Sequence, residues 1–253
     1  MRPSPQKIEK AKKFIPEYSK LCLNYVRPIL FGDLPLESID PLLKGATITF
    51  INTGERSLGI TNYHVFEKYL ELKKQNKNTI CQIDSLIFDP ESRLIDFNED
   101  RKVDLVTIDI TDDEFAQINA MPLYHKVWPV KITTEREIEP VFILGYPGHL
   151  RYIHSVDRID ATFGALMLTI DTITDKNLII VCNRDNWVVD YSIYGEVDIS
   201  RFRGFSGAGV FRMNNLTPEL LGIISGHAEE LLDVFYCSRS DLIEANGRLL
   251  IND

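Results

Sequence analysis

The chain has 253 residues, of which 44% are hydrophobic and 26% are charged, and its net charge is −9. This composition is that of a globular protein with enough residues for a sizeable core, as one barrel-type domain or two smaller lobes. The acidic balance argues against nucleic-acid binding, which needs a clustered basic face, and no apolar run reaches the roughly 18 residues that span a bilayer.

The N-terminal residues alternate Lys or Glu with apolar positions in a loosely helical rhythm, which Pro16 interrupts and Pro28 ends. We expect residues 1–44 to form a helical or irregular extension. From Gly45 the pattern changes to short runs rich in β-branched residues. The first two, ATITFIN and SLGIT, are joined by a predicted hairpin turn at residues 53–56.

Short strand-like runs continue through the rest of the chain, separated by loops rich in Asn, Asp, Lys and Pro. Near the C-terminus, residues 238–241 fit a capping box ahead of LIEANGRLL, which predicts a C-terminal helix. Many short strands with few helices between them indicate antiparallel sheets that close or stack. The sequence therefore predicts an all-β fold.

Four cysteines are spread along the chain without CxxC or Cys/His ligand spacing: Cys22, Cys81, Cys182 and Cys237. This pattern predicts neither a zinc site nor a dense disulfide framework. The N-terminus also lacks the apolar core and cleavage site of a signal peptide. We expect free thiols in a reducing compartment, and hence a cytoplasmic protein.

Residues 201–211, RFRGFSGAGVF, place Ser206 between Gly204 and Gly207. A serine hydroxyl is a poor nucleophile until a base accepts its proton, and a buried carboxylate helps by fixing the tautomer of that base. Of the five histidines, His64 has a suggestive context: GITNYHVFEKYL follows a short apolar strand and begins a segment that can turn helical. Considered alone, His64 is more often a structural or surface histidine.

Asp104 lies in RKVDLVTIDI, where a single acid is embedded in an otherwise apolar strand. Burying an unpaired carboxylate is unfavourable, so such an acid needs hydrogen-bond donors around it, and an imidazole N–H is one candidate. An aspartate at the exposed entry of the strand is the alternative that Asp104 alone leaves open.

Together, in chain order, these three contexts match elements of a known family. TNYHV around His64 resembles the TAAHC or TNNHV element of trypsin-like serine peptidases, DLVTI at Asp104 resembles their D-[IL]-A-[LV]-[LI] strand, and GFSGAGVF around Ser206 resembles their GxSGxPxx or GxSGGxxx element. The sequence is similar to chymotrypsin-fold serine peptidases, and nearest to the bacterial HtrA-like branch. GYPG and LLGIISGH extend the resemblance over most of residues 45–240.

The resemblance implies an all-β fold of two antiparallel six-stranded β-barrels, with an N-terminal helical extension over residues 1–44 and a C-terminal helix. The first barrel would comprise residues 45–130, with His64 and Asp104. The second would comprise residues 131–253, with Ser206.

The resemblance also implies roles for individual residues of a serine endopeptidase. Ser206 would attack the scissile carbonyl, His64 would take its proton and return it to the leaving amine, and Asp104 would orient and stabilise the imidazolium. The backbone N–H groups of Gly204 and Ser206 would form the oxyanion hole, where glycine permits the required turn. This mechanism needs no metal and no organic cofactor, and its partner is a polypeptide substrate.

Ser225, Gly226 and His227 would begin the strand that pairs with the substrate by β-augmentation. Ser200 stands where trypsins that cut after Lys or Arg have Asp, which argues against a trypsin-type pocket. Charged residues near these positions fit acidic substrates, basic substrates or a solvated surface, so the specificity stays open.

Phe205 stands where animal trypsins have Asp, and the chain lacks an IVGG-like start, so activation by zymogen cleavage is not expected. The PDZ domain of HtrA-like proteins is also not expected, which motivates the hypothesis of a regulatory partner protein. Two other classes of protein share part of this pattern. The α/β-hydrolase elbow fails at Ala208 and in chain order. A catalytically silent module that binds peptides or partner proteins would gain nothing from keeping this whole set of residues.

Overall fold

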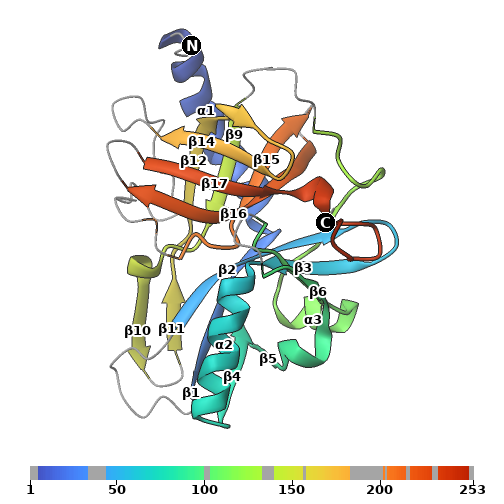
Figure 1. The fold of residues 1–253 in the computed structure, drawn as a ribbon. Coiled ribbons are helices and arrows are strands. Elements are labelled where there is room, and N and C mark those ends of the chain that lie inside the picture. Colours follow the sequence, from blue (N-terminus) through green and yellow to red (C-terminus); the bar gives the residue numbers. More distant parts are fainter. Residues whose placement is uncertain are drawn as a thin grey trace.

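The computed structural model describes most of the chain, and everything below concerns this part: residues 5–33, 44–99, 103–132, 140–155, 158–182, 202, 204–214, 217–229 and 233–250. These residues are mostly β-structure, arranged as two curled antiparallel sheets (Figure 1). The α-helices are α1 (Pro5–Leu23), α2 (Tyr63–Gln75) and α3 (Asp112–Gln117). None of the described helices is long and apolar enough to cross a membrane.

The first sheet has eight strands in the order β5-β4-β1-β2-β3-β7-β6, with β8 paired in parallel to β2. Its central strand, β2, is buried along almost its whole length because both faces are covered. Ile48 and Phe50 face the core of the first sheet, whereas the alternate residues Thr47 and Thr49 face the second sheet. The strand bounds are β1 (Val26–Asp33), β2 (Lys44–Asn52), β3 (Ser57–Thr61), β4 (Thr79–Ile83), β5 (Leu86–Phe88), β6 (Leu94–Phe97), β7 (Val106–Asp109) and β8 (Leu123–Tyr124).

The second sheet has seven strands in the order β12-β9-β15-β16-β17-β14-β13, and β10 and β11 form a separate two-stranded hairpin. The predicted all-β fold is therefore confirmed as a chymotrypsin-like pair of curled sheets, although six strands per barrel is not the count observed. The bounds are β9 (Pro140–Gly145), β10 (Arg151–Ser155), β11 (Arg158–Ala161), β12 (Gly164–Thr169), β13 (Thr172–Ile173), β14 (Asn177–Cys182), β15 (Gly209–Asn214), β16 (Thr217–Glu229) and β17 (Asp233–Arg239).

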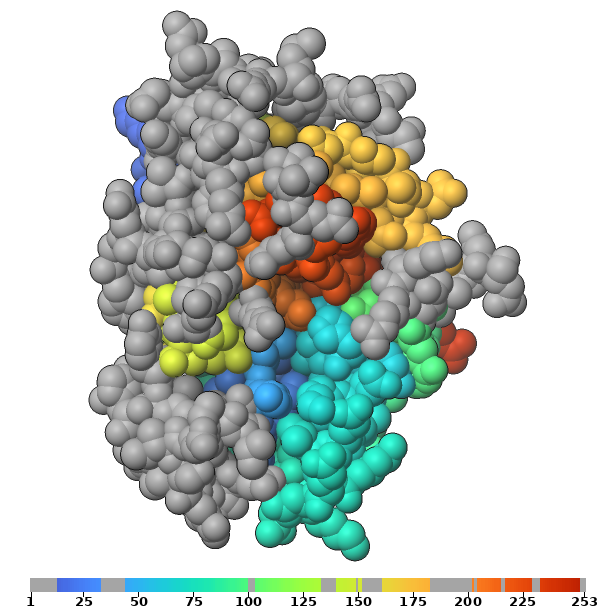
Figure 2. Space-filling view, turned by 60° about the vertical axis from the view of Figure 1, so that its left-hand side comes forward, coloured from blue at the N-terminus to red at the C-terminus, as the bar shows by residue number. Residues whose placement is uncertain are grey.

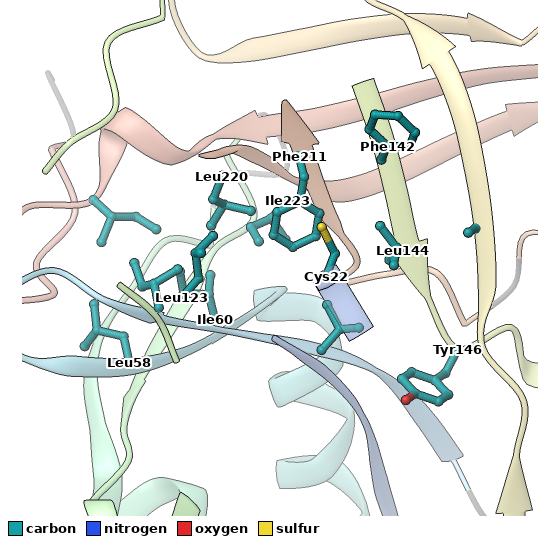
Figure 3. Close-up of a cluster of buried hydrophobic side chains, with 14 of the residues drawn as sticks. Cys22, Leu58, Ile60, Leu123, Phe142, Leu144, Tyr146, Phe211, Leu220 and Ile223 are labelled. Carbon is teal, nitrogen blue, oxygen red and sulfur yellow. The ribbon is translucent and has the colours of Figure 1, made fainter. Parts of the chain in front are cut away.

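A buried hydrophobic cluster joins the two sheets to each other and to α1. Figure 3 shows Leu58 and Ile60 of the first sheet facing Phe142, Phe211 and Leu220 of the second, with the Cys22 sulfur among them. All four cysteines are buried, and none of them forms a disulfide. This shared core holds the two sheets in a fixed relation, which a site built from both sheets requires.

The expectation of a separate N-terminal extension is wrong for residues 26–33. These residues form β1, which pairs with β2 on one side and with β4 on the other. Helix α1 also packs inward: Ile15 is 2% exposed, and the Tyr18 ring lies edge-on to Phe142, 4.9 Å between ring centroids. The charged residues at the N-terminus led to the prediction of an extension. The apolar run that follows them, VRPILFG, is a core strand despite Pro28.

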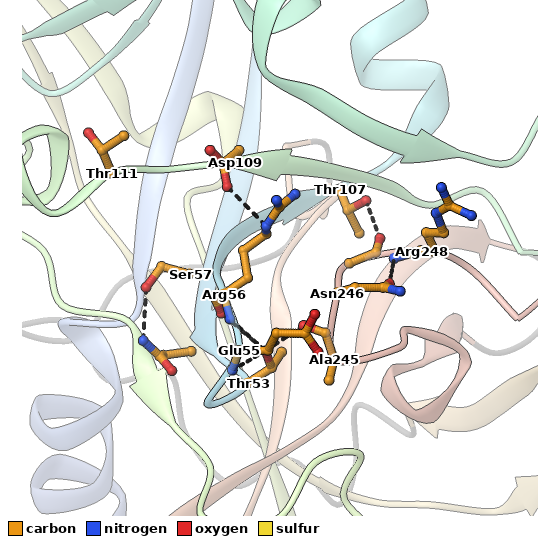
Figure 4. A network of polar contacts seen from close by, with 12 residues as sticks. Thr53, Glu55, Arg56, Ser57, Thr107, Asp109, Thr111, Ala245, Asn246 and Arg248 are labelled. Atoms are coloured by element: carbon orange, nitrogen blue, oxygen red, sulfur yellow. Dashed lines mark hydrogen bonds and ion pairs between the residues drawn. The ribbon is translucent and has the colours of Figure 1, made fainter.

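The predicted C-terminal helix is also wrong. Residues 240–242 form only a short 3-10 turn, and Ile243 then bridges Leu249. Two buried threonines hold this loop by its carbonyls, from Thr53 to Ala245 at 2.6 Å and from Thr107 to Gly247 at 2.6 Å (Figure 4). The loop turns at Gly247, whose φ of 89° is unsuited to a continuing helix.

The two sheets meet at the surface as well as in the core. In the space-filling view, blue and teal residues of the first sheet and α2 adjoin orange and red residues of the second sheet (Figure 2). His64 at the start of α2 and Ser206 ahead of β15 come together at this junction.

Candidate active site

His64 lies in the first turn of α2, immediately after β3. The first backbone N–H groups of a helix have no partner within the helix. In α2, Asp104 is the partner of one such group, because the backbone N–H of His64 donates to Oδ1 of Asp104 at 2.9 Å. The N-cap residue of α2, Asn62, donates its side-chain amide to the Asp104 carbonyl at 2.9 Å. The start of the helix and the aspartate are thus fixed to each other.

Asp104 has a φ of 44°, in the left-handed region that few residues other than glycine occupy. Aspartate is among those that tolerate it, at a cost of about 1–2 kcal/mol. The residue is 6% exposed, and this backbone conformation accompanies a carboxylate directed at His64, with Oδ2 2.5 Å from Nδ1. The buried acid therefore has its donors, and the alternative of an exposed strand entry does not hold.

Ser206 completes a chain of hydrogen bonds, because its Oγ lies 3.1 Å from Nε2 of His64. An ionised carboxylate only accepts hydrogen bonds, so Nδ1 of His64 carries the proton and Nε2 is left as the acceptor for the serine hydroxyl. The structure thus brings His64, Asp104 and Ser206 together in the order Asp, His, Ser.

The loop before β15 has the geometry of a tight turn at Gly204. The N–H of Phe205 donates to the carbonyl of Phe202 at 3.1 Å, and Gly204, the third residue of this turn, has a φ of 97°. A positive φ at that position is the mark of a type II turn. A Cβ on Gly204 would lie 2.5 Å from the backbone nitrogen of Gly148, so only glycine fits.

Gly207, on the other side of the serine, is equally constrained. Its φ is 85°, and a Cβ there would lie 1.9 Å from the carbonyl oxygen of Thr47. The two glycines therefore allow the loop to turn tightly and to lie against β2.

Two threonines of β2, which sequence reasoning missed, hold this loop from the first sheet. The N–H of Thr47 donates to the carbonyl of Ser206 at 2.8 Å, and its hydroxyl donates to the carbonyl of Gly204 at 3.1 Å. Thr49 donates to the carbonyl of Gly207 at 2.8 Å. The signal was present in ATITF: two threonines, two residues apart, share one face of a strand that is otherwise apolar.

The residues predicted to contact substrate lie beside this loop, except Ser200, which is outside the described residues. Strand β16 is bonded to the loop through Ile224, and Ser225, Gly226 and His227 follow in the same strand. The Ser225 hydroxyl donates to the carbonyl of Tyr236 at 3.0 Å. Their contact with a substrate stays a prediction.

The His227 ring packs against aromatic side chains of the loop and of β17. Its centroid lies 4.6 Å from that of Phe202 and 5.1 Å from that of Phe235, and its Nε2 lies 3.1 Å from Asp233. Only 16% of its side chain is exposed. His227 is therefore part of the wall next to Ser206 and is not a freely solvated side chain.

Another histidine, His125, has a different environment. It is 6% exposed and lies against Trp128, and burial lowers its pKa to about 4. Its Nε2 has no hydrogen-bond partner among the described residues. Nowhere among the described residues do three or more His, Cys, Asp or Glu side chains gather as a metal site requires.

The two curled antiparallel sheets have the chymotrypsin-like fold. The hydrogen-bonded side chains of Asp104, His64 and Ser206 lie where the two sheets meet. No protein-family model matches the chain, and no curated protein matches it.

Among solved structures, the chain is similar to the serine protease domain of the Sesbania mosaic virus polyprotein, with 11% identity and a TM-score of 0.43 over 84% of this chain and 87% of that one. It is similar to the thermostable serine protease AL20 of an extremophilic microorganism, with 13% identity and a TM-score of 0.43 over 86% and 91%. A structure from work on the Sesbania mosaic virus VPg protein has 10% identity and a TM-score of 0.44 over 84% and 85%.

Proposed function

We propose that the chain is a serine endopeptidase with Ser206 as nucleophile, His64 as general base and Asp104 as the residue that orients the imidazole. The observation that carries this proposal is the continuous chain of contacts, 2.5 Å from Asp104 to His64 and 3.1 Å from His64 to Ser206. Both distances are within the reach that proton transfer requires.

In the first half of the reaction, Nε2 of His64 removes the Ser206 proton while Oγ attacks the carbonyl carbon of the substrate. The negative charge that develops on the carbonyl oxygen is stabilised by the N–H groups of Gly204 and Ser206. His64 then gives its proton to the leaving amine as the C–N bond breaks, and an acyl-enzyme remains.

In the second half, a water molecule replaces the amine. His64 takes one proton from this water as its oxygen attacks the acyl carbon, and returns that proton to Oγ as the ester bond breaks. Asp104, which accepts from the backbone N–H of His64, keeps the proton of His64 on Nδ1 while Nε2 gains and loses its own proton in each half. The products are a carboxylic acid and an amine.

The finer expectations remain proposals. Likeness to the HtrA-like branch, a cytoplasmic location and activation by a partner protein all stay predictions. Within residues 1–44, helix α1 and strand β1 are packed into the core. A partner protein that acts through this segment would have to bind it in that packed state.

A fluorophosphonate probe, which reacts with activated serines, tests the proposal. We expect the parent chain to be labelled, the Ser206→Ala variant to be unlabelled, and a control to keep its labelling: Ser85→Ala, which removes an exposed serine whose hydroxyl donates to the carbonyl of Gln117. A catalytically silent peptide-binding module is the conclusion if the parent fails to react while a circular dichroism spectrum shows it folded.

A further inference from the structure

Arg151, the first residue of β10, inserts its guanidinium beside the loop that holds Ser206. Its Nη2 donates to the carbonyl of Tyr146 at 3.0 Å and lies 3.4 Å from the carbonyl of Ala46. A Cβ on Gly204 would lie 3.1 Å from this Nη2, and a Cβ on Gly45 would lie 2.5 Å from Nη1. The two glycines leave the space in which the guanidinium sits, next to a proposed oxyanion donor.

The charge of Arg151 has no counter-ion among the described residues, where only carbonyl oxygens accept from it. Its Nε is buried without a partner. Burial lowers the pKa of the guanidinium to about 10, so it stays protonated at neutral pH. A partly buried cation without an anion is unfavourable, and a bound carboxylate would relieve that deficit.

The position of Arg151 relative to Ser206 decides which half of a substrate it can meet. The nucleophile loop is bonded to β16 on one side, through Gly207 and Ile224, and to β2 on the other, through Thr47. Ser225 to His227 extend from the β16 side, whereas Arg151 contacts residues 45 and 46 at the start of β2. A peptide whose acyl half lies along β16 would extend its leaving half toward the start of β2, the side on which Arg151 lies.

We propose that Arg151 binds an acidic side chain of the substrate, at the first or second residue after the scissile bond. This inference rests on the proposed endopeptidase function and adds a substrate class to it. Nη2 is fixed by protein carbonyls, and Nη1 has no hydrogen-bond partner among the described residues, so Nη1 is the group that offers its N–H to the ligand. A charge-assisted hydrogen bond of this kind is about twice as strong as a neutral one.

The test uses pairs of peptides that are cut by the parent chain and differ only in Glu or Gln at those two positions. We expect kcat/KM for the Glu peptide to exceed that for the Gln peptide by about tenfold. Arg151→Met should abolish this preference and Arg151→Lys should retain part of it. Arg248→Met, which removes an exposed arginine of the C-terminal loop, is the matched control and should retain all of it.

Because Arg151 also joins two loops, the Met variant can be less stable, and a binding measurement on another variant covers that case. Ser206→Ala, which keeps Arg151, should bind a Glu-containing peptide more tightly than its Gln counterpart, with a difference that shrinks in high salt. Equal affinity for the two peptides would overturn the inference.

Three further outcomes are informative. Cleavage that is indifferent to Glu and Gln overturns the role of Arg151 while leaving the endopeptidase intact. If Arg151→Met lowers kcat equally for both peptides, the guanidinium supports the loop that carries the proposed oxyanion donors. That result also overturns the proposed binding of an acidic side chain. Absence of both labelling and cleavage in the parent defeats the proposed function itself, and the inference with it.

Discussion

Replacing Thr47 by valine tests whether β2 positions the nucleophile loop. Valine has nearly the same shape but lacks the hydroxyl, which donates to the carbonyl of Gly204 at 3.1 Å and accepts from the N–H of Tyr146 at 2.9 Å. The backbone bond from Thr47 to Ser206 survives the change. Thr47→Val therefore removes the side-chain support of Gly204 without touching any residue of the proposed triad.

The size of the effect follows from these contacts. Thr47 is fully buried, so the Tyr146 N–H and the Gly204 carbonyl lose a partner that water cannot easily replace. Two such losses should lower the free energy of unfolding by about 2–4 kcal/mol. Complete removal of an oxyanion donor slows catalysis by about 100-fold to 1000-fold, so a loosened Gly204 should lower kcat by about tenfold with little change in KM.

Thr107→Val is the matched control, since Thr107 is also fully buried and its hydroxyl donates to the carbonyl of Gly247, away from the nucleophile loop. Urea denaturation should show a comparable loss of stability in both variants. The rate of fluorophosphonate labelling should fall only in Thr47→Val. If both variants label at the parent rate, or both slow equally, Thr47 has no special role in positioning the loop.

Three other changes have definite expected outcomes. Asp104→Asn should lower the labelling rate by about 10⁴-fold because the amide favours the wrong tautomer of His64, and labelling at the parent rate would contradict the assigned role. The pKa of His125, about 4 in the folded chain against 6.5 ordinarily, means that the unfolded state binds the proton first as pH falls. Stability should therefore drop by about 3 kcal/mol between pH 6.5 and pH 4, and in urea titrations His125→Gln should lose this part of the drop; an unchanged pH profile would count against it. Deletion of residues 1–33 should abolish cooperative unfolding because it removes β1 from between β2 and β4, and a cooperative transition at the parent midpoint would show that β1 is dispensable.

The residues that the sequence predicted best were those whose neighbours along the chain form recognisable motifs. His64, Asp104 and Ser206 each sit in a short motif beside a strand, and their order identified a fold that brings such motifs together. Local context and chain order together pointed to side chains that the structure brings into contact, although they lie 40 and 142 positions apart. Their catalytic roles stay a prediction.

Features that depend on contacts distant in sequence were not predictable in the same way. The residues adjacent to Thr47 in the sequence do not predict that Gly204 packs on it. Likewise, the residues adjacent to Asp104 do not predict its positive φ. The C-terminal helix failed for a related reason. Its expected cap, Ser238, lies within β17 instead and donates its hydroxyl to the carbonyl of Val103, a tertiary contact that overrides the local capping pattern.

The hydrogen bond from Thr47 to Ser206 links a strand near the beginning of the chain to a loop near its end. A nascent polypeptide still lacking β15 and β16 cannot hold Ser206 beside the imidazole of His64. If the proposed function is correct, a newly made chain therefore cannot cleave other proteins until its synthesis is nearly finished. Reactivity toward an active-site probe would accordingly report completed docking of both halves.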